Sequence, residues 1–133
     1  LLIGGPSGGI VSKDYIDVLY DYDEIYKLGA MVGSGALYVI PYNQNIVELV
    51  MYLMKFFADE SCGQCIPCRV GTVKLTNILD NLLNNSKELP ENLDEINEFI
   101  MKVSLCGLGQ AAPIPLITAM KYFSDEFKIK TLT

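Results

Sequence analysis

The sequence contains no histidine among its 133 residues. Histidine is the side chain that most often changes its charge near neutral pH, and it is the commonest metal ligand. Its absence excludes histidine catalysis, a serine–histidine triad and imidazole coordination of a metal within this sequence. The four cysteines therefore carry the conspicuous chemistry.

Basic residues and long apolar runs are also scarce. Ten lysines and arginines face 16 aspartates and glutamates, which gives a net charge of −6. Nucleic acids select basic surfaces, so we expect no nucleic-acid partner. No apolar run approaches the ~18 to 20 residues that a membrane-spanning helix requires, so we expect no direct insertion into a membrane.

The cysteines form a triplet and a singleton. Cys62, Cys65 and Cys68 have C-x2-C-x2-C spacing, and Cys106 stands in Ser-Leu-Cys-Gly-Leu-Gly-Gln, residues 104–110. Two intervening residues let a tight turn direct successive sulfurs at one centre, and four thiolates complete the ligand set of an iron–sulfur cluster. The spacing predicts a single [4Fe–4S] cluster held by these four residues.

Other uses of four cysteines fit less well. Zinc also takes four thiolates, but its sites usually combine two separated C-x2-C pairs, so a structural zinc module for assembly is the main alternative. A thioredoxin-like redox motif needs only one C-x-x-C and leaves two cysteines unused. Disulfides fit poorly because crowded cysteines of this kind suit a reducing compartment. We therefore expect a cytoplasmic protein. A peripheral position at a membrane, as part of a larger complex, is compatible with this expectation.

Residues 1–44 have the pattern of a small α/β piece. A strand is expected at the start, a glycine-rich turn at 4–9, a short helix at 21–28 and a strand at 36–40. The glycines at 4–9 and 33–35 lack the context of a phosphate-binding loop, so we interpret them as turns. A ligand-binding module built on residues 1–44 is a third possible function, after the iron–sulfur and zinc alternatives. The chain begins inside an expected strand, which suggests a fragment of a longer polypeptide.

Residues 45–133 have helical periodicity. Helices are predicted at 46–58, 67–83, 92–103 and 114–127, the first of them capped by Asn45 and apolar on nearly all sides. Four helices with short connections predict a bundle. The fold class is thus α+β, mainly α: a four-helix bundle at 45–133 that carries the cluster, preceded by the piece at 1–44.

Two motifs suggest how the protein tunes a cluster. Gly63, Gly107 and Gly109 lack a Cβ, so their backbone amides could approach the cluster closely. Arg69 and Lys74 follow the triplet, and the sequence leaves open whether they act on the cluster or are surface charges.

The cysteine motifs, together with the glycine-rich segments at 4–9 and 32–36, resemble a known family. The chain is similar to the C-terminal part of the NADH-binding flavoprotein subunit of respiratory complex I and of related NAD(P)-reducing hydrogenase and formate dehydrogenase subunits. The likeness covers essentially the whole chain, and residues 1–44 resemble the ubiquitin-like domain of that family. Gln64, Ile66 and Val70 depart from the common motif without affecting the cysteines.

The resemblance implies a function and partners. In that family four cysteines, matched here by Cys62, Cys65, Cys68 and Cys106, bind a [4Fe–4S] cluster that takes electrons from FMN reduced by NADH. The FMN- and NAD(P)H-binding region lies upstream and is not in these 133 residues. The expected partners are that region of the same polypeptide and other iron–sulfur subunits. The fragment alone is expected to relay electrons without catalysing NADH oxidation.

Overall fold

The computed structural model describes residues 1–85 and 87–128. Its elements, in chain order, are β1 (Leu2–Ile3), η1 (Gly5–Ser7), η2 (Lys13–Tyr15), α1 (Tyr22–Lys27), β2 (Leu37–Tyr38), α2 (Ile46–Glu60), α3 (Ile66–Asn85), α4 (Leu93–Val103), α5 (Gly107–Ala111), α6 (Ile114–Tyr122) and η3 (Ser124–Phe127). The prediction of a mainly helical α+β chain is confirmed.

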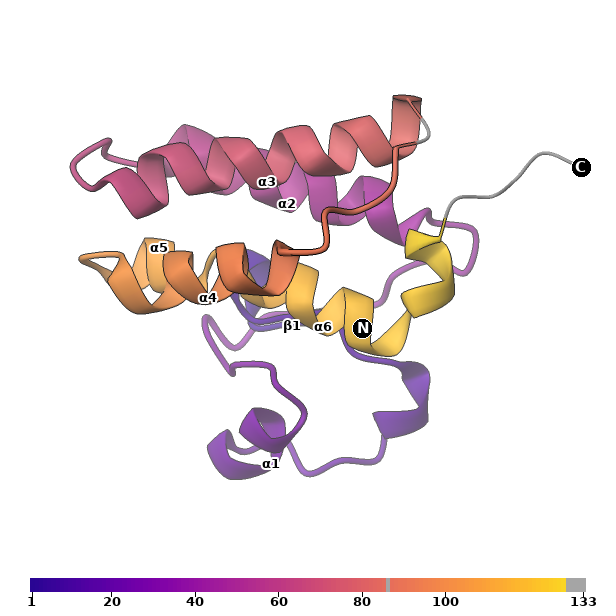
Figure 1. Ribbon diagram of the computed structural model, residues 1–133. Coiled ribbons are helices and arrows are strands. Elements are labelled where there is room, and N and C mark those ends of the chain that lie inside the picture. Colours follow the sequence, from indigo (N-terminus) through magenta and orange to yellow (C-terminus); the bar gives the residue numbers. More distant parts are fainter. Residues whose placement is uncertain (86, 129–133) are drawn as a thin grey trace, which may run out of the picture.

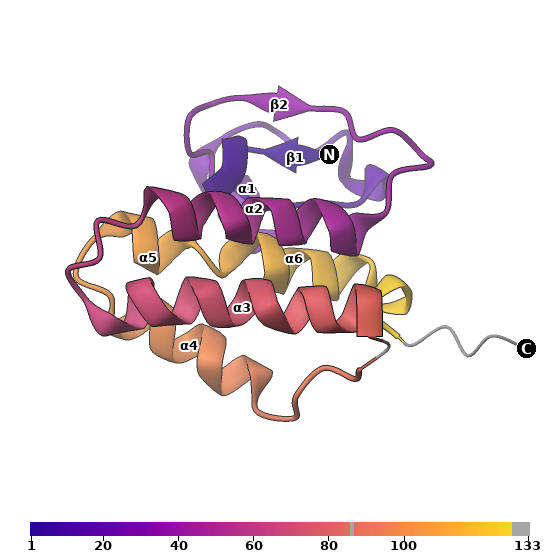
Figure 2. The same cartoon turned by 90° about the horizontal axis from the view of Figure 1, so that it is seen from above.

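The helices form two layers (Figure 1). One layer contains α2 and α3, and the other contains α4, α5 and α6. The main core lies between these layers and is made by buried side chains of α2, α3, α4 and α6, including Val50, Leu75, Ile100 and Leu116. Viewed from above, the loop between α2 and α3 and the short helix α5 lie at the same end of the bundle (Figure 2).

Local sequence explains where the helices start and stop. Asn45 accepts a hydrogen bond from the backbone N–H of Glu48 at 3.0 Å and thus caps α2, as predicted. Pro67 occupies the first turn of α3, where its missing N–H costs no hydrogen bond. Asp21 caps α1, and Gly29 follows the helix with φ of 86°, a left-handed conformation that favours glycine.

The helices do not bury all of their apolar side chains. Phe56, Phe99 and Ile117 are 43%, 53% and 37% exposed. The buried stripe of α4 runs through Leu93, Asn97 and Ile100, so Phe99 is rotated away from it. Likewise α2 buries one face rather than all sides, and Phe56 packs edge-on against the buried Phe57 with the ring centroids 5.6 Å apart.

One predicted helix is shorter than expected, and one observed helix was not predicted. The helix expected at 114–127 ends at Tyr122, because Phe123 leaves helical geometry with φ of −133° and ψ of 37°, and the chain continues as η3. Helix α5 was not predicted, since five residues containing two glycines carry no helical periodicity.

No helix in the described part of the chain is both long and apolar enough to cross a bilayer.

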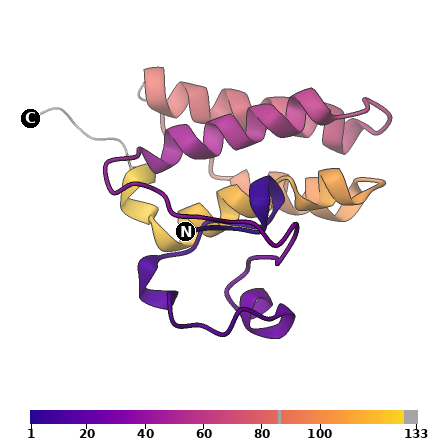
Figure 3. The same cartoon turned by 180° about the vertical axis from the view of Figure 1, so that it is seen from behind.

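The N-terminal residues form a small layer of their own beside the bundle (Figure 3). Strands β1 and β2 pair antiparallel, with Leu2 opposite Tyr38 and Ile3 opposite Leu37. A second cluster of buried side chains lies within this layer and is made by Ile3, Val11, Ile25, Leu28 and Ala30. Whether residues 1–44 are a separate ubiquitin-like domain stays a prediction.

The glycine-rich turns pack against each other. A Cβ added at Gly4 would lie 2.3 Å from the Met31 carbonyl oxygen, and one added at Gly33 would lie 2.3 Å from that of Gly4. Both glycines also have positive φ, 72° and 53°. Glycine is therefore required here by close backbone packing, which supports the turn interpretation over a phosphate loop.

Candidate metal centre

The structure brings the four cysteines together. Cys62 lies in the loop between α2 and α3, Cys65 directly precedes α3, Cys68 lies in its first turn, and Cys106 immediately precedes α5. All four line a single cavity of about 90 Å³, together with Glu60, Ser61, Gln64 and Leu108. None forms a disulfide. Segments almost 40 residues apart in the sequence thus supply thiols to one space at the end of the bundle.

The thiols surround the cavity without converging on one point. Within residues 1–85 and 87–128, no three histidine, cysteine, aspartate or glutamate side chains are close enough to hold a single metal ion. A tetrahedral zinc site needs its sulfurs at about 2.3 Å from one ion. A cubane instead offers a different iron to each thiolate, so its ligands stand apart around a larger group. Four thiols around one cavity are compatible with such a cluster.

The four cysteines differ in exposure. Cys62 and Cys106 are exposed, Cys65 is half-buried and Cys68 is buried with 4% of its surface exposed. The cavity thus has an open side at Cys62 and Cys106 and an inner side at Cys68. The side chains of Ile66 and Leu105, which are 63% and 75% exposed, flank the ligand positions. This side of the cavity is accessible to solvent.

The loop that carries the first two cysteines is held by two local interactions. Gly63 has φ of 77°, which lets the chain turn between Cys62 and Cys65. Arg69 Nη1 donates a hydrogen bond of 2.7 Å to the carbonyl oxygen of Gly63. This contact gives Arg69 a structural role in the loop, which the sequence had left open, whereas Lys74 is exposed.

Backbone N–H groups favour the thiolate of Cys65. The N–H of Leu105, followed by that of Cys68, holds the pKa of the Cys65 thiol below its usual value, although burial opposes this. A thiolate is the form that ligates iron. Because Leu105 adjoins Cys106, the segment with the singleton cysteine also stabilises the triplet.

Gly109 forms a tight cradle beside the cysteines. A Cβ added there would lie 2.4 Å from Ser104 Oγ and 2.9 Å from Cys68 Cβ. At Gly107, in contrast, an added Cβ would meet no protein atom within 4 Å. Close packing thus explains glycine at 109, while close approach to a cluster remains the prediction for Gly107.

Two serines near the cysteines were missed by sequence reasoning. Ser61 Oγ lies 3.3 Å from Cys68 Sγ. Ser104 is 4% exposed, and its hydroxyl makes no hydrogen bond within the described residues, although it lies near enough to Cys65 to contribute to the lowered pKa of that thiol. A buried hydroxyl without a partner beside four thiols fits a site built for an additional group. Their positions immediately before the cysteine motifs were the available signal.

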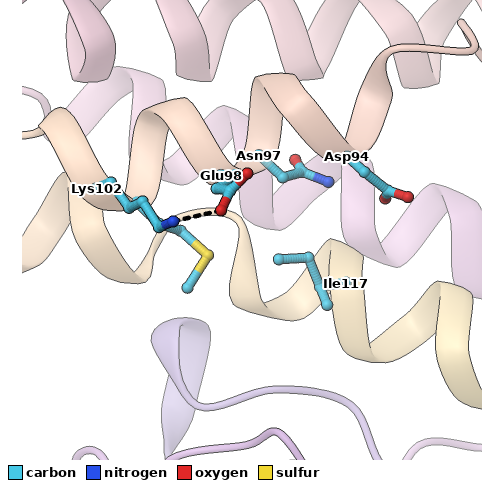
Figure 4. A pocket seen from close by; sticks show the side chains of 6 residues that line it. Asp94, Asn97, Glu98, Lys102 and Ile117 are labelled. Carbon is cyan, nitrogen blue, oxygen red and sulfur yellow. Dashed lines mark hydrogen bonds and ion pairs between the residues drawn. The ribbon is translucent and has the colours of Figure 1, made fainter.

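A second depression lies between α4 and α6 (Figure 4). It is lined by Asp94, Asn97, Glu98, Met101, Lys102 and Ile117. Lys102 pairs with Glu98 at its edge. Asn97 is 1% exposed, and its amide nitrogen and oxygen make no hydrogen bond among the described residues. It contains no cysteine and is separate from the thiol cavity.

Comparison with known proteins identifies the family. Residues 48–130 match the family described as the NADH-ubiquinone oxidoreductase-F iron-sulfur binding region. The chain belongs to this family. The match contains all four cysteines, and the family supports the [4Fe–4S] cofactor and the resemblance that the sequence motifs predicted.

Alignments to individual relatives cover nearly the whole chain. The NADP-reducing hydrogenase subunit HndC of Solidesulfovibrio fructosivorans is 34% identical over 127 residues, which are 94% of this chain and 26% of that protein. An NADH-quinone oxidoreductase subunit of Mycobacterium bovis is 34% identical over 126 residues, or 93% of this chain and 28% of that protein. The chain thus spans about a quarter of the length of these relatives.

A solved structure shows the same fold. The crystal structure of an NAD⁺-reducing [NiFe]-hydrogenase in the air-oxidized state superimposes with a TM-score of 0.83 at 25% identity, covering 96% of this chain and 22% of that chain. The H2-reduced state of the enzyme gives a TM-score of 0.82. The helical bundle and its small β piece therefore recur in a larger oxidoreductase.

Proposed function

We propose that Cys62, Cys65, Cys68 and Cys106 bind a [4Fe–4S] cluster that relays single electrons within an NAD(P)H-linked oxidoreductase. The observation that carries the proposal is the single cavity lined by all four thiols. The family supports an iron–sulfur cluster over the zinc alternative.

The residues of this chain have three tasks in such a relay. The thiolates hold the cluster, which when bound supplies a one-electron couple. The N–H groups of Leu105 and Cys68 stabilise negative charge at Cys65, and Arg69 fixes the loop between the first two ligands. Burial of Cys68 keeps the inner side dry, while Cys62 and Cys106 leave an exposed route for electrons.

The wider assignment concerns the parent protein. We infer that residues 1–44 form the ubiquitin-like piece and residues 45–133 the cluster-binding bundle. An upstream FMN- and NAD(P)H-binding region would pass electrons to the cluster, and other iron–sulfur subunits would receive them. Relatives named as hydrogenase and quinone oxidoreductase subunits support such a setting, and the chain covers only about a quarter of each.

Reduction by NADH with and without flavin tests the relay. The reconstituted protein is mixed anaerobically with NADH, in one sample alone and in another with a flavoprotein diaphorase. We expect the absorbance of the cluster to stay unchanged with NADH alone, because hydride transfer needs a two-electron acceptor. It should bleach when the flavoprotein is present, and dithionite serves as the positive control. Rapid bleaching by NADH in flavin-free protein would contradict a relay without a catalytic site.

A further inference from the structure

Ser61 stands between the end of α2 and the most buried cysteine. It directly follows α2, with φ of −64° and ψ of 125°. Its hydroxyl oxygen lies 3.3 Å from Cys68 Sγ across the turn, and it also accepts a hydrogen bond of 3.3 Å from the N–H of Gly63. Ser61 thus directly precedes Cys62 but contacts Cys68, seven residues after the serine.

Ligation of iron by Cys68 would fix the direction of the Ser61–Cys68 hydrogen bond. A hydroxyl has one hydrogen to donate and two lone pairs to accept with. The N–H of Gly63 donates to one lone pair of the oxygen, and the hydroxyl hydrogen remains available for the sulfur of Cys68. A thiolate that ligates iron has no hydrogen of its own, so it can only accept this bond.

We propose that Ser61 is a positioning residue whose O–H···S bond to the Cys68 thiolate raises the reduction potential of the cluster. The inference rests on the proposed function, since it assumes that Cys68 ligates iron. Reduction adds one electron and no proton to the cluster–thiolate unit, which increases the negative charge on its sulfurs. A fixed donor stabilises the reduced state more than the oxidised state, and hydrogen bonds to the sulfurs are a recognised determinant of potential.

Burial makes this bond more important than one at the exposed ligands. Cys68 is 4% exposed, whereas Cys62 and Cys106 are exposed and can be hydrated by water. A hydrogen bond is stronger electrostatically where the surroundings have a low dielectric constant. The buried hydroxyl of Ser104 makes no hydrogen bond to Cys68 in the described residues, so the structure assigns the role at this buried ligand to Ser61.

A pair of isosteric variants isolates the hydroxyl. Ser61→Thr keeps a hydroxyl, and Ser61→Val has nearly the same shape without one; both side chains suit the extended backbone at this position. Ser61→Ala removes the hydroxyl alone, and Ser124→Ala changes an exposed serine of η3 as a control. Each protein is reconstituted, its iron and acid-labile sulfide are measured, and its potential is determined by redox titration followed by EPR spectroscopy.

The variants without the hydroxyl should have a lower potential. At a fixed solution potential we expect the ratio of reduced to oxidised cluster to fall about tenfold in Ser61→Ala and Ser61→Val, or about 59 mV for a one-electron couple. Ser61→Thr and Ser124→Ala should stay close to the wild type. If Ala and Val lose iron while Thr retains it, the hydroxyl is needed to position Cys68, which supports the positioning role of Ser61.

Equal potentials of the Thr and Val variants with the cluster bound, or equal loss of iron from both, would overturn the role of Ser61. A wild-type protein without iron and sulfide would instead refute the proposed function itself. The two failures are therefore distinguishable in the same set of measurements.

Discussion

The guanidinium of Arg69 in α3 donates a 2.7 Å hydrogen bond to the backbone carbonyl of Gly63, six residues earlier. This bond closes the loop that contains Cys62 and Cys65 onto the helix that contains Cys68. Arg69 thus helps to fix the three thiols of the triplet relative to one another. It does so without a hydrogen bond to any of the three thiols among the described residues.

Arg69→Met should therefore weaken retention of the cluster without unfolding the bundle. A hydrogen bond with a charged donor contributes roughly 1.5–3 kcal/mol, and solvent at this exposed residue reduces that value. We expect loss of iron to a chelator to be several times faster, with the far-ultraviolet circular dichroism unchanged. Lys74→Met, which removes an exposed cation of the same helix, is the matched control. Equal rates in the two variants would refute the role of Arg69.

The sequence predicted most of the long helices because their amphipathic periodicity and caps are local features. The cap predicted at Asn45 is confirmed, and the helix predicted at 67–83 is present as α3. The stop of α6 at Tyr122 and the exposure of Phe99 could not be predicted, since they depend on which face meets a neighbouring helix.

The four cysteines could be identified from spacing, whereas their supporting contacts could not. The loop contact of Arg69, the tight packing of Gly109 and the hydroxyl contact of Ser61 arise from three-dimensional proximity. None has a periodic signature in the sequence. The sequence shows serines near the cysteines, but it does not show which atoms their hydroxyl groups contact.

Gly109→Ala should destabilise the cluster-binding end of the bundle. The new methyl group would overlap Ser104 Oγ and crowd Cys68, and overpacking of this kind typically costs about 1–3 kcal/mol. The measurement is denaturant unfolding of the cluster-free protein. Gly107→Ala, where an added Cβ meets no protein atom within 4 Å, should show no loss. Similar unfolding curves for Gly109→Ala and the wild type would contradict the packing argument.

Gly107→Ala has a second use. If the backbone at Gly107 approaches the cluster closely, this variant should bind less iron even though its cluster-free form is as stable as the wild type. Full iron content in Gly107→Ala would show that glycine is not required there for the cluster.

Asn97→Leu should stabilise the protein. Both polar atoms of the Asn97 amide are buried without a hydrogen bond in the described residues, and an unsatisfied buried group costs about 1–3 kcal/mol. Leucine has a similar size and extends the apolar stripe between Leu93 and Ile100. The free energy of unfolding from denaturant titration should increase by about 1–3 kcal/mol relative to the wild type. Asn77→Leu, at an exposed site on α3, is the control. A loss of stability only in Asn97→Leu would mean that this amide has a favourable partner.

Removal of the cluster should loosen the two segments that bear its ligands. Binding to the native state adds directly to the stability of the site, while the apolar helix faces pack without metal. Amide hydrogen exchange should therefore accelerate at residues 61–68 and 104–110, with little change in α6. Unchanged exchange in both ligand segments would contradict this expectation.

Iron and acid-labile sulfide in wild type and Cys106→Ala test the central claim most directly. Cys106 is the ligand candidate farthest in sequence from the triplet, and only the fold brings it to their cavity. Anaerobically reconstituted wild type should contain about four irons and four sulfides per chain, as a [4Fe–4S] cluster requires. Cys106→Ala should lose most of both. Zinc without sulfide in the wild type, or the full iron and sulfide content in Cys106→Ala, would contradict a cluster held by these four cysteines.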